Sequence, residues 1–161
     1  IAMRAIVGQH VSVEAATTIV GRLVARAGVP VTTPFDGLTH LFPAPAAVAA
    51  ADLAGIGMPA ARVATLQRFA AGVSDGRIPL EITGSYEETV RSLCAIEGIG
   101  PWTAEYIALR ALGEPDAFPA GDLGLRKALG NGAPASEKDV AAAAEAWRPW
   151  RGYAAMYLWS M

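Results

Sequence analysis

The chain has 161 residues, of which 53% are apolar and 17% are charged, and its formal net charge is −2. That length suffices for one well-packed domain, and no apolar run approaches the roughly 18 residues of a membrane helix. Non-specific affinity for DNA comes largely from clustered Lys and Arg, so the charge argues against DNA binding through a broadly cationic surface. Any contact with DNA must use backbone amides and a few local arginines.

The few cysteines and histidines limit the metal chemistry of the chain. Its single cysteine, Cys94, excludes an internal disulfide and any four-cysteine zinc or iron–sulfur site. His10 and His40 are far apart in the sequence, which argues against a metal site built from side chains. Because no signal peptide is visible, we expect a cytoplasmic protein with no membrane partner.

The apolar residues are mostly alanine, and Val/Ile/Thr alternation is almost absent, so the fold class is predicted to be all-α. In the N-terminal half, Ser12 is a plausible N-cap, and no strand pair is convincing. Helices are expected over 1–7, 12–27, 46–51 and 60–72.

In the C-terminal half, Ser85 and Glu88 have the spacing of a capping box. Ser136 and Asp122 are further candidate N-caps. Helices are expected over 85–95, 102–112, 123–129, 136–147 and 150–160.

A Gly-Ile-Gly sequence occurs twice, at 55–57 and at 98–100, each time shortly before a proline and a helix. The repetition is explained equally well by a duplicated turn and by coincidence in a chain rich in glycine and alanine.

The second of these turns, Gly98-Ile99-Gly100, has a definite physical use. Glycines let a phosphate approach the backbone closely, and the helix that follows directs its amide groups and positive dipole end to the same place. Ile99 can fill the gap between the two helices. The turn can therefore bind a phosphodiester backbone without a basic surface, although an ordinary helix connection has the same spacing.

Four stretches resemble the helix-hairpin-helix/Gly-Pro-Asp superfamily of DNA glycosylases, and within it the 3-methyladenine DNA glycosylase II (AlkA) type. They are Arg4–Ser12, Leu93–Ala104, the segment from Asp116 to Lys127 that contains Asp122, and Trp147–Ala154. The resemblance covers nearly the whole chain and implies an all-α fold with two helical lobes and a cleft between them. Residues 1–161 would form the helical glycosylase domain, without the N-terminal sheet domain that relatives commonly carry.

Asp122 is the catalytic candidate. An aspartate before a helix is ordinarily an N-cap and often nothing more. In the family, the aspartate at this position drives cleavage of the glycosidic bond, where a fixed carboxylate stabilises the positive charge that develops on the sugar or activates a water. Capping and catalysis are compatible.

The predicted base pocket consists of Trp102, Tyr106 and Trp150. Trp102 and Tyr106 are four residues apart and share a helix face, so they could equally be core aromatics. A flipped, positively charged alkylated base needs aromatic faces to stack on. Trp150 joins them through its match to the family's terminal Trp-x-Pro-Trp pattern, whereas Trp147 and Trp159 are assigned to the core.

The resemblance assigns further roles. Gly98, Ile99, Gly100 and Thr103 would form the DNA-binding hairpin. Gln9 and His10 fall where the family inserts a wedge into the duplex, although His10 could also be an ordinary loop histidine. Trp102 occupies the position at which strand-cutting relatives carry a lysine that forms a Schiff base, so the expected activity is monofunctional base release.

No cofactor is expected, apart from a monovalent cation that the family can hold through hairpin carbonyls, here within 94–99. The main hypothesis is a monomeric, nucleoid-associated glycosylase that acts on alkylated bases in double-stranded DNA. The alternatives are a non-catalytic helix-hairpin-helix DNA-binding module and a helical protein-interaction domain. Asp122 and the aromatic pair Trp102/Tyr106 argue against a pure DNA-binding module, which needs neither.

Overall fold

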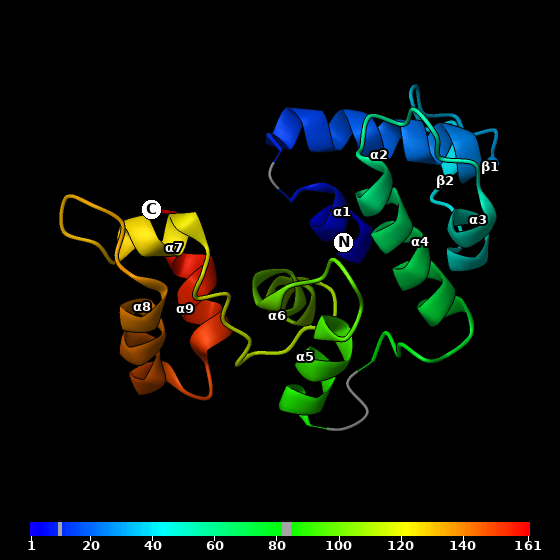
Figure 1. Cartoon of the computed structure of the whole chain (residues 1–161). Coiled ribbons are helices and arrows are strands. Elements are labelled where there is room, and N and C mark those ends of the chain that lie inside the picture. Colours follow the sequence, from blue (N-terminus) through cyan, green and yellow to red (C-terminus); the bar gives the residue numbers. More distant parts are fainter. Residues whose placement is uncertain (10, 82–84) are drawn as a thin grey trace. The chain divides into compact units, whose positions relative to one another are not determined.

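The computed structural model describes residues 1–9, 11–81 and 85–161, and within these ranges the chain is mostly helical (Figure 1). The elements are α1 (Ala2–Val7), α2 (Val13–Ala27), β1 (Val29–Pro30), β2 (His40–Leu41), α3 (Pro45–Ala50), α4 (Ala60–Ser74), α5 (Tyr86–Cys94), α6 (Pro101–Arg110), α7 (Leu123–Ala128), α8 (Glu137–Ala144), the 3-10 helix η1 (Glu145–Trp147) and α9 (Arg151–Leu158). None of these helices is both long enough and apolar enough to cross a membrane.

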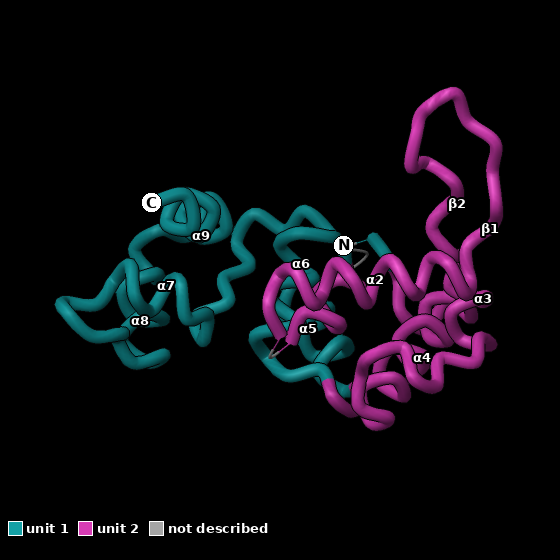
Figure 2. The backbone as a smooth tube through the Cα atoms, turned by 90° about the horizontal axis from the view of Figure 1, so that it is seen from above, with its two compact units in different colours: residues 1, 80–95, 99–161 teal, residues 2–79, 96–98 magenta. Residues whose placement is uncertain are grey.

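The chain divides into two compact units, which are coloured separately in Figure 2. Unit 2 consists of Ala2–Pro79 and Ile96–Gly98, and unit 1 consists of Ile1, Leu80–Ala95 and Ile99–Met161. The expected all-α class is confirmed, and so are two helical units.

Unit 2 contains α1 to α4. The apolar faces of α1 and α2 supply Ile6 and Leu23, and α4 supplies Leu66 and Phe69, all of which are almost fully buried. Helices α3 and α4 pack against each other.

Unit 1 contains α5 to α9. Its core centres on Phe118, Leu125, Val140, Ala144 and Ala155. Phe118 comes from the loop between α6 and α7, so this loop is part of the core. The segment that leads to Asp122 is therefore anchored by a buried side chain.

The expected helix caps are confirmed. The side chains of Ser12, Ser136 and Asp122 accept hydrogen bonds from the amides of Ala15, Asp139 and Leu125. Ser85 and Glu88 form the complete capping box, each side chain accepting from the other residue's amide.

Two expectations for the secondary structure were wrong. Val29–Pro30 and His40–Leu41 form a short antiparallel pair, whereas no strand pair was expected. Two-residue strands are too short to show a period-2 pattern, and the prolines nearby indicated only a loop. The helix expected to reach Trp147 ends at Ala144 and continues as the 3-10 helix η1, a tighter form that is common at helix ends.

Candidate active site

The candidate site in unit 1 is organised around the carboxylate of Asp122. Asp122 is the N-cap of α7, and its Oδ1 accepts a hydrogen bond from the amide of Leu125 at 3.1 Å. Leu125 is fully buried. The local sequence therefore anchors Asp122 to the core through an ordinary cap.

Two tryptophans also donate hydrogen bonds to this carboxylate. The Nε1–H of Trp102 bonds to Oδ2 at 3.0 Å, and the Nε1–H of Trp159 bonds to Oδ1 at 2.9 Å. Trp102 lies in the first turn of α6, and Trp159 caps the end of α9. Donors from three different helices thus fix the orientation of one carboxylate, far more than an N-cap requires.

The same tryptophans belong to an aromatic cluster of Trp102, Tyr106 and Trp159. The rings of Trp102 and Tyr106 are stacked, with centroids 5.5 Å apart and planes at 30°. Tyr106 and Trp159 are tilted by 48° with centroids 5.8 Å apart. All three side chains are half-buried, so the predicted pairing of Trp102 with Tyr106 beside Asp122 is what the structure shows.

Trp159 is the functional candidate that sequence reasoning missed. It was assigned to the core, and part of its ring does pack there, but its indole N–H also reaches Asp122. A helix turns by about 100° per residue, so Trp150 and Trp159 lie on opposite sides of α9. That arithmetic places the two tryptophans on different sides of the helix, but it does not show which one faces Asp122.

Trp150 is placed away from this cluster. It is the N-cap of α9, 58% exposed, and its ring contact is with Tyr153, edge-on at 5.8 Å. A rise of about 1.5 Å per residue along α9 separates it from Trp159 by about 13 Å. The structure therefore does not bring Trp150 together with Asp122, and its role in binding a base stays a prediction.

The arginines that flank Trp150 are engaged in a compact ion cluster. Arg151 is buried and binds both carboxylate oxygens of Asp116 at 2.9 Å. Glu145 pairs with Arg151 at 3.0 Å and with Arg148 at 2.8 Å, and Arg148 also pairs with Asp116. The hydrogen bond from Arg148 holds the pKa of Glu145 below its usual value. This cluster ties the start of α9 to the loop that leads to Asp122.

The first glycine of the hairpin turn has a backbone conformation that other residues rarely adopt, as predicted. Gly98 has φ +92°, and a Cβ there would lie 2.1 Å from Oγ1 of Thr65. That hydroxyl donates to the carbonyl of Glu97 at 2.9 Å. Ile99 is buried, as expected for a residue that fills the gap between two helices.

The last glycine of the hairpin is open. Gly100 is the N-cap of α6, and among the described residues no atom lies within 4 Å of the position that a Cβ would take. Thr103, one turn further on, is only 2% exposed. This burial disfavours direct contact between the Thr103 hydroxyl and DNA, whereas the backbone around Gly100 is accessible.

The predicted duplex wedge is described only in part. Gln9 lies next to the hairpin turn in unit 2, where its Nε2 is 3.5 Å from the carbonyl oxygen of Gly98, a long hydrogen bond. The backbone carbonyl of Gln9 accepts from Arg62. His10, the other expected wedge residue, lies outside the described residues.

The described residues contain no group of three His, Cys, Asp or Glu side chains that could hold a metal ion. The monovalent cation that the resemblance implies would use the hairpin carbonyls within 94–99 instead. Two of these carbonyls accept hydrogen bonds, that of Glu97 from Thr65 and Arg68, and that of Gly98 from Gln9. The cation site stays a prediction.

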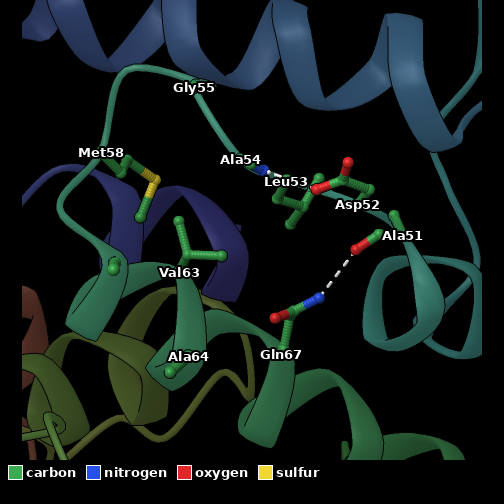
Figure 3. A pocket seen from close by; sticks show the side chains of 10 residues that line it. Ala51, Asp52, Leu53, Ala54, Gly55, Met58, Val63, Ala64 and Gln67 are labelled. Carbon is green, nitrogen blue, oxygen red and sulfur yellow. Dashed lines mark hydrogen bonds between the residues drawn. The ribbon is translucent and has the colours of Figure 1, made fainter.

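A separate hollow of about 470 Å³ lies in unit 2, beside the first Gly-Ile-Gly turn (Figure 3). Most of its lining is Ala, Gly and Val, and the Gln67 amide that points into it bonds to the carbonyl of Ala51 at 2.8 Å. Its one carboxylate, Asp52, caps the amide of Ala54 at 3.0 Å. No aromatic ring lines this hollow, so it lacks the carboxylate–aromatic arrangement found around Asp122.

Named proteins of similar sequence and fold are known for this chain. No family model matches the chain. It is 43% identical over 160 residues to a Mycobacterium tuberculosis protein named "Probable bifunctional transcriptional activator/DNA repair enzyme AlkA", a match that covers 99% of this chain and 32% of that protein. It is 35% identical over 162 residues to "DNA-3-methyladenine glycosylase 2" of Escherichia coli, covering 98% of this chain and 55% of the relative.

A solved structure extends the likeness to the fold. The 3-methyladenine DNA glycosylase Mag1 of Schizosaccharomyces pombe, solved in complex with abasic DNA, superposes with a TM-score of 0.78 at 27% identity. The superposition covers 98% of this chain and 77% of that one. The chain spans about a third to a half of the two sequence relatives.

Proposed function

The chain belongs to the helix-hairpin-helix DNA glycosylase superfamily, and we propose that it is a monofunctional glycosylase for alkylated bases of the 3-methyladenine type. Its substrate would be double-stranded DNA, from which it would flip the damaged nucleotide, release the base and leave an abasic site for base excision repair. The observation that carries this proposal is the carboxylate of Asp122, which is fixed by two indole donors and one amide inside an aromatic cluster.

The proposed chemistry needs a fixed negative charge beside the sugar. As the bond between C1′ and the base nitrogen breaks, its electron pair leaves with the base and positive charge develops on the sugar. Preorganised electrostatic groups stabilise such charge without the cost of reorientation during the reaction. The three donors to Asp122 support this role, because they hold the carboxylate in one orientation before the substrate arrives.

The two carboxylate oxygens are not equivalent. Among the described residues, Oδ1 of Asp122 accepts from Leu125 and Trp159, whereas Oδ2 accepts only from Trp102. A carboxylate oxygen can accept about two hydrogen bonds. Oδ2 is therefore the atom with remaining capacity, and we assign it to face the sugar or the water that adds to C1′.

The aromatic cluster suits the proposed lesion. Bases with positive charge are attracted to the faces of Trp and Tyr rings, and a flipped base stacks between such groups. Trp102, Tyr106 and Trp159 supply these rings around the carboxylate. An alkylated base is also a better leaving group, so stacking and charge can select it without contacts to every base edge.

The hairpin would hold the DNA backbone. The positive dipole end of α6 lies at Gly100, where the backbone is open to a phosphate. A monovalent cation on the remaining carbonyls within 94–99 would add positive charge beside that phosphate. This mode of binding is compatible with a net charge of −2.

The absence of a lyase step follows from Trp102. A strand-cutting glycosylase needs an amine to form a Schiff base with the sugar, and the side chain at this position is an indole that donates to Asp122. We further propose that the protein acts as a monomer in the cytoplasm, on the DNA of the nucleoid.

Release of 3-methyladenine from methylated duplex DNA tests the proposal. We expect the 161-residue chain to release the base, to leave abasic sites, and to give no covalent adduct with DNA under borohydride. Salt-dependent binding to duplex DNA without base release would instead favour a non-catalytic DNA-binding module. A borohydride-trapped adduct would contradict the monofunctional assignment.

A further inference from the structure

Glu105 is a half-buried carboxylate of unit 1 that the proposed reaction does not use. Its Oε2 accepts a hydrogen bond from the amide of Phe118 at 3.0 Å and another from the hydroxyl of Tyr86. Tyr86 lies in α5, Glu105 in α6, and Phe118 in the loop before α7. One carboxylate therefore joins three segments of the unit.

The position of Glu105 on α6 is directly related to the candidate site. Residues three and four apart share a helix face, so Glu105 lies on the same face as Trp102 and is adjacent in sequence to Tyr106. Helix α6 thus contacts the loop at two points, through Glu105 at Phe118 and through the Trp102 indole at Asp122.

The segment between these two points is a compact turn. The amide of Ala120 bonds to the carbonyl of Phe118, and the amide of Asp122 bonds to the carbonyl of Pro119, both at 2.8 Å. Phe118 and Pro119 are buried. Because so few residues separate Phe118 from Asp122, a displacement of the Phe118 backbone is transmitted to the catalytic carboxylate.

We propose that Glu105 is a positioning residue, which fixes the Phe118–Asp122 turn so that the Asp122 carboxylate stays within reach of its two indole donors. This inference rests on the proposed glycosylase function for its effect on rate, but its structural part does not. Glu105 does not contact the reacting atoms, because both hydrogen-bonding partners of its Oε2 are groups of the protein itself.

A carboxylate is suited to this position because of its surroundings. The buried Arg151 and the carboxylate of Asp116 both act on Glu105 electrostatically, with opposite signs. A single side-chain oxygen accepts from a hydroxyl and an amide at once, which a shorter side chain at this position could not reach. Glutamine keeps an oxygen acceptor at the same length, so it is the conservative replacement.

The test compares Glu105→Ala with Glu105→Gln in the 161-residue chain. We expect Glu105→Ala to lower kcat for 3-methyladenine release by about tenfold or more, since a small misplacement of a catalytic group can cost as much as about a hundredfold. Affinity for duplex DNA should change by less than about threefold. Glu105→Gln should restore most of kcat.

Stability loss alone is controlled by Asp52→Ala, which removes the hydrogen bond to the amide of Ala54 in unit 2 and leaves Tyr86, Glu105 and Phe118 untouched. At a matched decrease in Tm, Asp52→Ala should retain kcat. Equal losses of kcat in Asp52→Ala and Glu105→Ala would overturn the positioning role.

A second readout does not depend on activity. The indole N–H resonances of Trp102 and Trp159, assigned through Trp→Phe variants, report their hydrogen bonds to Asp122. We expect both to shift in Glu105→Ala and to stay near their wild-type positions in Glu105→Gln. If the unsubstituted chain releases no base, the proposed function fails, and unshifted indole resonances in Glu105→Ala would separately refute the inference about Glu105.

Discussion

The two Gly-Ile-Gly turns have the same sequence, but they differ in the backbone of the last glycine, which has φ +105° at Gly57 and φ −89° at Gly100, and in what surrounds them. Each places a buried isoleucine, Ile56 or Ile99, between two helices. At the last glycine of the first turn, Gly57, a Cβ would lie 2.7 Å from the guanidinium of Arg22. At the last glycine of the second, Gly100, the corresponding space is open among the described residues.

The space beside the last glycine of the first turn is therefore occupied by an arginine of the same chain. Arg22 donates to the carbonyl of Ile56 at 3.1 Å, and Arg26 donates to that of Ala54 at 2.6 Å. The place that a phosphate would take beside Gly57 is filled by Arg22. The Gly-Ile-Gly pattern therefore specifies a helix connection, and the neighbouring side chains decide whether that connection can bind a ligand.

The largest effect on base release is expected at Asp122, and Asp52 should show none. Asp122→Asn should lower base release by about 10²- to 10³-fold, because the charge that stabilises the transition state is lost. Affinity for duplex DNA should be nearly unchanged. Asp52, which caps Ala54 in unit 2, is the matched control, and Asp52→Asn should leave both properties intact. Single-turnover release of 3-methyladenine and duplex titration measure the two effects, and undiminished excision by Asp122→Asn would refute the catalytic assignment.

The contrast between these two aspartates also shows what could be predicted from the sequence. Short-range features were predictable, since a capping box such as Ser85/Glu88 and the cap at Asp122 involve residues three apart. The indole of Trp159 is 37 residues from Asp122 in sequence. That contact depends on how α9 packs, which local patterns do not encode.

The roles of Glu105 and Arg22 also could not be predicted from local sequence patterns. Glu105 had no recognisable motif, because its partners, Tyr86 and the amide of Phe118, come from separate segments. The repeated Gly-Ile-Gly pattern was visible in the sequence, but the filling of the first turn by Arg22 was not, because that arginine belongs to α2. The family resemblance supplied Asp122 and Trp102, and the structure added the residues that hold them.

The next effect tests whether the indole donors distinguish Asp122 from an ordinary cap. Trp159→Phe removes the hydrogen bond to Oδ1 while keeping a ring against Tyr106. A hydrogen bond to a charged group contributes about 1.5–3 kcal/mol, so kcat should fall by about tenfold or more. Steady-state kinetics on a methylated duplex measure this loss.

Trp147→Phe is the control for lost aromatic packing. Trp147 packs edge-on against Phe118, with centroids 6.0 Å apart, and is not bonded to Asp122. The Trp147→Phe variant should have a lower free energy of unfolding, with little change in kcat. If the two variants lose kcat equally, the contribution of Trp159 is packing rather than hydrogen bonding.

A smaller effect is expected on stability when a glycine of either turn is replaced by alanine. Gly98→Ala and Gly57→Ala both force a side chain into positive φ, +92° and +105°, which should lower the free energy of unfolding by roughly 1–2 kcal/mol each. Gly98→Ala should lower the free energy of unfolding by about 1–3 kcal/mol more than Gly57→Ala. The new Cβ at Gly98 meets the short side chain of Thr65, whereas the one at Gly57 meets the flexible end of Arg22. Denaturant unfolding measures the difference.

Affinity for DNA is the second property in which Gly98→Ala and Gly57→Ala should differ. Gly98→Ala should weaken affinity for duplex DNA several-fold, whereas Gly57→Ala should leave it unchanged, because the first turn is closed by Arg22. Equal weakening by both substitutions would mean that the first turn also contacts DNA, and the distinction between the two turns would fail.

The smallest effect is a dependence of stability on pH that arises at one polar anchor of unit 1. The second Gly-Ile-Gly turn is held by the hydroxyl of Thr65, which donates to the carbonyl of Glu97, whereas the loop before Asp122 is held by a carboxyl group. The loop of unit 1 is held by Glu105, and burial raises the pKa of this carboxyl above its usual value of 4.5. Tyr86, Arg151 and Asp116 are the other ionisable groups that act on it.

The sign of the effect follows from linkage. Between pH 4.5 and the raised pKa, the folded state binds more protons at Glu105 than the unfolded state does, so this group's contribution to stability is present at low pH and is lost as pH rises through that window. The unfolding free energy of the unsubstituted chain minus that of Glu105→Gln should therefore fall with rising pH and then level off. Urea unfolding of both proteins across this range measures the difference, from which the titration of Glu145 cancels. A difference that stays constant would show that folding does not shift the pKa of Glu105, and one that rises with pH would show that folding lowers it; either result would contradict the prediction.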